Sequence, residues 1–130
     1  MKIIVFGSNL SGHHGKGAAL YAKEHYGARQ HNPSGFQGQS YAIPTKGARN
    51  EALREKYPIL PLPVIAASIR VMLDEARQSP YDTYAITRIG CGLAGYKNEQ
   101  IAPMFESAPN NCEFDPEWAP WGLKSWVEKP

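Results

Sequence analysis

Apolar and glycine-rich stretches alternate along this chain. It opens on a continuous apolar run, Ile3–Phe6, and runs without alternation are typical of a parallel strand covered on both faces. A glycine-rich stretch, Gly7–Gly17, follows. Residues 18–24 are mostly good helix formers, and Gly27 is placed to end a helix. The first unit therefore predicts a strand, a glycine-rich loop and a helix.

The middle of the chain is more polar. Residues 29–38 are glycine-rich and predict a surface loop. Tyr41–Ile43 predicts a short strand, which Pro44 should end or confine to a sheet edge. The charged stretch 47–58 is expected to be irregular or to form a short helix.

A longer helix is predicted next, with Pro63 in its first turn and Ser79–Pro80 after its end. Its apolar residues recur at the spacing of one helix face: Ile65, Ile69, Met72, Leu73 and Ala76. This spacing predicts an amphipathic helix.

A second strand–loop–helix unit completes the pattern. Tyr84–Thr87 predicts a strand that runs into a second glycine-rich loop, Arg88–Tyr96. Asn98 is placed to cap a helix. The apolar stripe of that helix is Ile101, Met104 and Phe105. Residues 108–130, with all three tryptophans, predict an aromatic-rich covering tail without regular structure.

This order of elements predicts an α/β fold with a mainly parallel sheet, built as one domain over residues 1–130. Each glycine-rich loop follows a strand and precedes a helix. Because ligands bind at the carboxyl ends of strands in such sheets, both loops should meet at one site. Their backbone N–H groups suit a diphosphate, although neither loop has the Rossmann or P-loop spacing. The alternative is that the glycines only make tight turns.

Composition narrows the class of protein. With 42% hydrophobic residues the chain can build a core, which excludes disorder despite 12 Gly and 11 Pro. No apolar stretch is long enough to span a membrane, so we expect no membrane partner and no secretory signal. A net charge of +2 without a charge block excludes a strong general nucleic-acid binder and permits a local anion site. Cys91 and Cys112 have no metal-ligand or redox spacing, so we expect a reduced, cytoplasmic protein without a metal.

Three segments, Gly12–Ala19, Tyr41–Lys46 and Arg88–Leu93, resemble landmarks of macrodomains, in the right order. They are most similar to the branch that contains terminal ADP-ribose glycohydrolase, which removes ADP-ribose from protein carboxylates. Macrodomain antitoxins that strip ADP-ribose from DNA are similar in the same places. The resemblance spans Ile3 to about Phe105. It implies a small three-layer α/β/α fold and a site that needs no cofactor.

The resemblance also implies roles for individual residues. Lys46 falls on the lysine that attacks the anomeric carbon of the distal ribose. The implied ligand-binding residues lie at the end of the first strand and in the two loops: Gly7, Ser8, Asn9, Gly15, Lys16, Gly17, Ala18, Gly90, Cys91, Gly92, Leu93, Ala94, Gly95 and Tyr96. That glycohydrolase has an aspartate where this chain has Ala94. The usual adenine-recognising aspartate and its strand have no counterpart here, so adenine recognition is unsupported.

The implied function is binding of ADP-ribose or a related NAD-derived nucleotide, with hydrolysis of an ADP-ribosyl linkage through Lys46. Two alternatives stay open: a non-catalytic binding module, and a phosphatase acting on ADP-ribose phosphate. Lys46 favours an enzyme and Ala94 favours a binder. The implied partner is ADP-ribose itself or an ADP-ribosylated protein or DNA, and the acceptor is not determined by sequence.

Four further kinds of side chain have two readings each. His13 and His14 are expected to be solvated loop residues, against acid–base work or metal ligation. Cys91 is expected to pack within its loop, against activation as a nucleophile. Arg88 either neutralises a phosphate or points away from the site. Tyr96 either stacks on a ribose or base, or is an ordinary half-buried aromatic.

Overall fold

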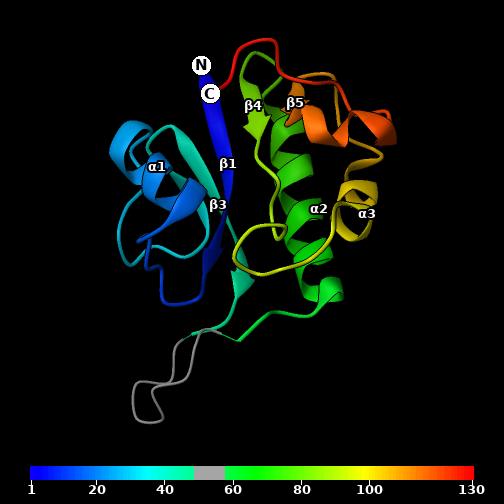
Figure 1. The fold of residues 1–130 in the computed structure, drawn as a ribbon. Helices are drawn as coiled ribbons and strands as arrows, with labels where there is room; N and C mark the ends of the chain where they lie inside the picture. The colour runs from blue at the N-terminus through cyan, green and yellow to red at the C-terminus, as the bar shows by residue number, and fades with distance from the viewer. Residues whose placement is uncertain (49–57) are drawn as a thin grey trace.

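The computed structural model describes residues 1–48 and 58–130. Within these residues, five strands form one sheet in the order β2-β3-β1-β4-β5 (Figure 1). Their bounds are Lys2–Asn9 for β1, Gly35–Gln37 for β2, Ser40–Lys46 for β3, Thr83–Ile86 for β4 and Cys112–Phe114 for β5. All neighbouring pairs are parallel except β2 with β3. The predicted mainly parallel α/β fold is confirmed.

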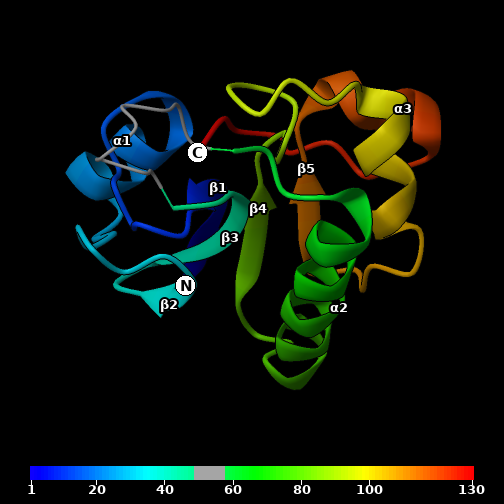
Figure 2. The same cartoon turned by 90° about the horizontal axis from the view of Figure 1, so that it is seen from below.

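Helices cover both faces of this sheet (Figure 2). On one face lies α1, Gly17–His25. On the other lie α2, Leu62–Gln78, and α3, Asn98–Ile101, which continues into the 3-10 helix η1, Ala102–Phe105. A second 3-10 helix, η2, spans Pro116–Trp121. The molecule therefore has three layers.

The apolar run at the start of β1 serves both faces. Side chains alternate along a strand, so Ile3 and Val5 pack in the larger cluster under α2, and Ile4 and Phe6 pack in the smaller cluster under α1. The predicted apolar face of α2 is buried at all five positions: Ile65, Ile69, Met72, Leu73 and Ala76. Gly27, with φ of 74°, follows the end of α1 as expected.

Two predictions for the middle of the chain were wrong. Residues 29–38, expected to be a loop, contain the edge strand β2, whose Phe36 lies edge-on to Tyr41 at 4.8 Å between ring centroids. β3 runs through Pro44 and lies inside the sheet. It tolerates proline there because β2 pairs with β3 only as far as Ala42. Of the stretch 47–58, residues 49–57 lie outside the described part of the chain.

The second unit also departs from expectation. Asn98 is the first residue of α3, and Lys97 occupies the N-cap position. Pro103 lacks the N–H that an α-helix needs at that position, and the chain tightens there into η1.

The tail was expected to have no regular structure, yet it supplies β5 and η2. The N–H of Phe114 donates to Lys124 O at 2.7 Å, and the N–H of Trp126 donates to Phe114 O at 2.9 Å, so later tail residues cover the outer edge of β5. Of the tail tryptophans, Trp118 is fully buried in the core, whereas Trp121 is 38% exposed. None of the described helices is both long and apolar enough to cross a membrane.

Candidate functional site

The ends of three parallel strands and both glycine-rich loops lie along one edge of the sheet, the lower edge in Figure 1. β1, β3 and the second loop approach one another at Gly7. A Cβ built there would lie 3.4 Å from Thr45 Oγ1 and 3.7 Å from the amide nitrogen of Gly90. The Thr45 hydroxyl donates to Ser8 O at 3.3 Å. The sequence analysis did not single out Thr45, whose polar side chain in an otherwise apolar strand was the available clue.

The register of β1 and β3 shifts at this edge. Ser8 pairs with Pro44, but the next residue, Asn9, pairs with Lys46, so β3 has one extra residue, Thr45. Such bulges bend a strand and re-aim its side chains, often beside functional sites. Lys46 is half-buried, and its carbonyl accepts from the N–H of Leu10 at 2.9 Å. The bulge thus sets the candidate nucleophile at the end of two central strands.

Ser8 and Asn9 hold the surrounding loops. The Asn9 amide donates from Nδ2 to His13 O at 3.0 Å and accepts from the N–H of His13 at 3.1 Å. The Ser8 hydroxyl donates to Pro33 O. Both side chains were expected to approach a ribose, and in the structure their polar groups fix the first glycine-rich loop and its neighbour.

The first loop leads into α1 through Gly15, Lys16, Gly17 and Ala18, all exposed. Lys16 is the N-cap and makes no side-chain capping bond. The first N–H groups of a helix have no partner within the helix, so they are available to an anion. Gly17 has a φ of 58° and open space where a Cβ would project, whereas the His13 ring lies beside Gly15.

The two adjacent histidines differ sharply, and the expectation of solvation was wrong for His14. His14 is fully buried, with Nε2 3.1 Å from Asn32 O and 3.2 Å from Gln37 Oε1. Both partners are acceptors, because Gln37 Oε1 also accepts from the N–H of Arg29. His14 therefore donates from Nε2. His13 is exposed, as expected, with Nδ1 3.0 Å from Gln30 Nε2.

The second loop, residues 90–96, is closed by a bond from the N–H of Tyr96 to Gly90 O at 2.9 Å. Gly90 and Gly95 need glycine, because their φ angles are 77° and 83°. Gly92 does not have a positive φ, and no atom lies within 4 Å of its Cβ position. Leu93 is 66% exposed and Ala94 only 3%. Of these neighbours, the loop therefore buries Ala94 and presents Gly92 and Leu93 to solvent.

The contacts of three side chains around this loop bear on the alternatives left open by the sequence. Arg88 turns from the strand edge to Asn98 and Glu117, with both contacts at 3.1 Å. The Tyr96 hydroxyl donates to Leu60 O at 2.6 Å, which joins the loop to the segment before α2. Burial raises the pKa of the half-buried Cys91 thiol above its usual value, although Arg88 lowers it. A raised thiol pKa favours the packing role for Cys91 over activation as a nucleophile.

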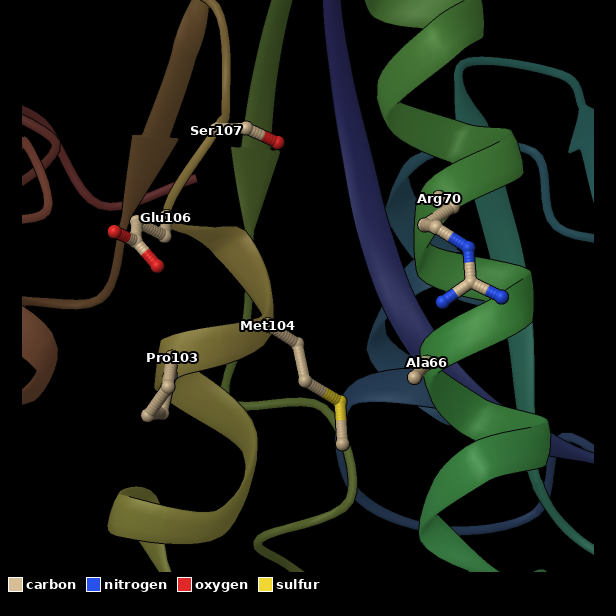
Figure 3. Close-up of a pocket in the computed structure, with 6 residues that line it drawn as sticks. All are labelled: Ala66, Arg70, Pro103, Met104, Glu106 and Ser107. Atoms are coloured by element: carbon tan, nitrogen blue, oxygen red, sulfur yellow. The ribbon is translucent and has the colours of Figure 1, made fainter.

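Two cavities lie away from this edge. One of about 490 Å³ lies between α2 and η1, where Met104 is directed toward α2 (Figure 3). Another, of about 140 Å³, lies beneath the tail beside Phe105 and Lys124. Neither is lined by a residue expected from sequence to bind ligand. Among residues 1–48 and 58–130, no group of three His, Cys, Asp or Glu side chains could hold a metal ion.

No protein-family model and no curated protein matches this chain. Solved structures do. A macrodomain protein from Streptomyces coelicolor is similar with a TM-score of 0.54 at 14% identity, over 88% of this chain and 87% of its own. A protein of unknown function from Bacteroides thetaiotaomicron has a TM-score of 0.56 at 16% identity, over 82% of this chain and 78% of its own. A second protein from that organism has a TM-score of 0.54 at 15% identity, over 82% of this chain and 80% of its own.

These likenesses show the fold: the chain has the α/β architecture of a macrodomain protein. The glycohydrolase branch and the roles of the site residues stay predictions.

Proposed function

We propose that this protein binds ADP-ribose, or a related NAD-derived nucleotide, at the carboxyl edge of its sheet. The observation that carries the proposal is the meeting of β1, β3 and the second glycine-rich loop around Gly7, in a fold like that of a macrodomain protein. The open start of α1 supplies one set of N–H donors for a diphosphate, and the loop at residues 90–96 supplies backbone for the other side.

The ligand-binding residues of this proposal come from both loops. On the first side they are Gly7, Ser8, Asn9, Gly15, Lys16, Gly17 and Ala18. On the second they are Gly90, Cys91, Gly92, Leu93, Ala94, Gly95 and Tyr96. Arg88 is engaged with Glu117, so neutralisation of the diphosphate falls to backbone N–H groups and to Lys16.

Titration calorimetry with ADP-ribose tests this proposal, with ADP and ribose 5-phosphate as partial ligands. We expect saturable binding of ADP-ribose that is tighter than binding of either fragment, because only the whole molecule reaches both loops. Absence of binding at millimolar ADP-ribose would overturn the proposal.

A second candidate function, hydrolysis of an ADP-ribosyl linkage, is favoured by the bulge that sets Lys46 at the strand edge. In that reaction the deprotonated Nζ of Lys46 forms a bond to the anomeric carbon of the distal ribose as the bond to the acceptor oxygen breaks. Water then adds to the same carbon, and the amine leaves with a proton. Release of ADP-ribose from an ADP-ribosylated glutamate peptide, compared in wild type and Lys46→Ala, tests it.

A further inference from the structure

Side chains from three separate segments join behind the second glycine-rich loop. We call this group the loop clasp: Arg88, Asn98, Glu117 and Trp118. Asn98 Oδ1 accepts from Arg88 NH1 at 3.1 Å and from Trp118 Nε1 at 3.0 Å. Two donors on one atom identify it as the amide oxygen. Arg88 precedes the loop and Asn98 follows it, so this amide joins the two ends of the loop.

The clasp is anchored in the core. Trp118 is fully buried, with its ring 5.4 Å from that of Phe105 and 6.1 Å from that of Phe114. Glu117 adds an ion pair to Arg88 at 3.1 Å, but this carboxylate is 60% exposed and contributes little by itself. The bond from the buried indole to Asn98 is therefore the main tie between loop and tail.

Only part of the loop is packed: Ala94 is 3% exposed and Cys91 packs against the core, whereas its exposed glycines have no close neighbours. Neither Gly92 nor Gly95 has any atom within 4 Å of a Cβ position. Its ends are held by the bond from the Tyr96 hydroxyl to Leu60 O and by the clasp.

We propose that Asn98 is a positioning residue, which holds loop 90–96 in the conformation that receives the ligand. This inference rests on the proposed binding function. If the clasp is lost, the loop samples other conformations, and the measured affinity falls by the fraction of molecules in which the loop is competent. Through Glu117 and Trp118, the tail from Cys112 onward thereby helps to hold the loop of the proposed site in place.

The test compares Asn98→Ala, Asn98→Asp and Trp118→Phe with wild type. Asn98→Asp keeps an acceptor oxygen for both bonds, and Asn98→Ala removes it. Trp118→Phe removes the indole N–H while keeping an aromatic ring in the core. Asn111→Ala is the matched control, because Asn111 donates to three carbonyls, of Ala76, Ser79 and Asp82, at the opposite end of β4. Three readouts apply to each: melting temperature, amide hydrogen exchange of residues 90–96 without ligand, and the Kd for ADP-ribose.

We expect Asn98→Ala and Trp118→Phe to speed exchange in residues 90–96 and to raise Kd roughly tenfold. Asn98→Asp should stay close to wild type in both. Asn111→Ala should lower the melting temperature without changing loop exchange or Kd. Unchanged loop exchange and affinity in folded Trp118→Phe would overturn the proposal, as would equal effects in the Asn111 control. If wild type does not bind ADP-ribose, the proposed function fails, and ligand-free exchange alone decides whether the clasp holds the loop.

Discussion

Asn9 and Lys46 occupy the last paired position of β1 and β3, one step beyond a bulge at Thr45. The side-chain amide of Asn9 is hydrogen-bonded to the backbone of His13 through both its nitrogen and its oxygen. This pair therefore combines a residue that holds the first glycine-rich loop with the candidate nucleophile beside it. The arrangement allows loop positioning and chemistry to be changed separately.

Lys46→Ala should separate binding from turnover. If Lys46 attacks the ribose, the variant should bind ADP-ribose with at most a few-fold loss of affinity and should lose its hydrolysis of ADP-ribosylated glutamate. We expect the wild-type rate itself to be slow, because no carboxylate stands at position 94. Calorimetry and release of ADP-ribose measure the two effects. Strong wild-type hydrolysis that survives Lys46→Ala would assign the chemistry to another residue.

Ala94→Asp should raise the hydrolysis rate. A positioned carboxylate that assists proton transfer is typically worth about 10²–10⁴-fold. Ala94 is only 3% exposed, so we also expect a loss of stability of about 1–3 kcal/mol from burying a polar group. Ala94→Asn is the control, because it has a similar size and cannot transfer the proton. A gain that persists after Lys46→Ala is added would contradict the lysine mechanism.

Gly92→Glu should abolish nucleotide binding while the protein stays folded. The site of a new side chain is open in the free protein, so the melting temperature should change little. The added carboxylate would enter the space of the diphosphate and repel it. Gly92→Ala, which adds only a methyl group, is the milder control. Normal ADP-ribose affinity in folded Gly92→Glu would remove this loop from the site.

His14→Ala should be far more damaging than His13→Ala, although the two residues are neighbours. His14 is fully buried and lies edge-on to Phe6 at 5.2 Å between ring centroids. We expect a loss of about 2–4 kcal/mol from the cavity and the lost hydrogen bonds. Because His13 is exposed, His13→Ala should lower the free energy of unfolding by at most about 0.5 kcal/mol. Urea denaturation of the two variants measures the difference, and equal losses would contradict the buried placement of His14.

Cys112 should make the protein less stable in alkali. Burial raises the pKa of its thiol to about 12, above its value of about 8.5 in an unfolded chain. The unfolded state therefore releases this proton first, and the free energy of unfolding should fall between these two pH values by up to about 1.4 kcal/mol per pH unit. Cys112→Ala should show a shallower fall. Identical slopes from denaturant titrations at several pH values would contradict the buried thiol.

The sequence by itself determined the elements with a strong pattern. The unbroken run Ile3–Phe6 predicts a strand covered on both faces. A strand with one face in solvent would instead alternate apolar and polar residues. The apolar spacing in α2 likewise identified every residue that the helix buries. From these elements came the parallel sheet, and from their order came the placement of both glycine-rich loops at one edge of it.

Tertiary structure decided what has no local pattern. β2 exists because Phe36 and its neighbours find β3 beside them, and three polar-flanked residues carry no periodicity of their own. Asn98 looked like a helix cap because such caps are local, whereas its partners, Arg88 and Trp118, are brought to it only by folding. The burial of His14 likewise depends on acceptors at Asn32 and Gln37, which distant pairing places around it. Hydrogen-bond partners far apart in sequence are fixed by the packing of whole elements, and no single segment encodes them.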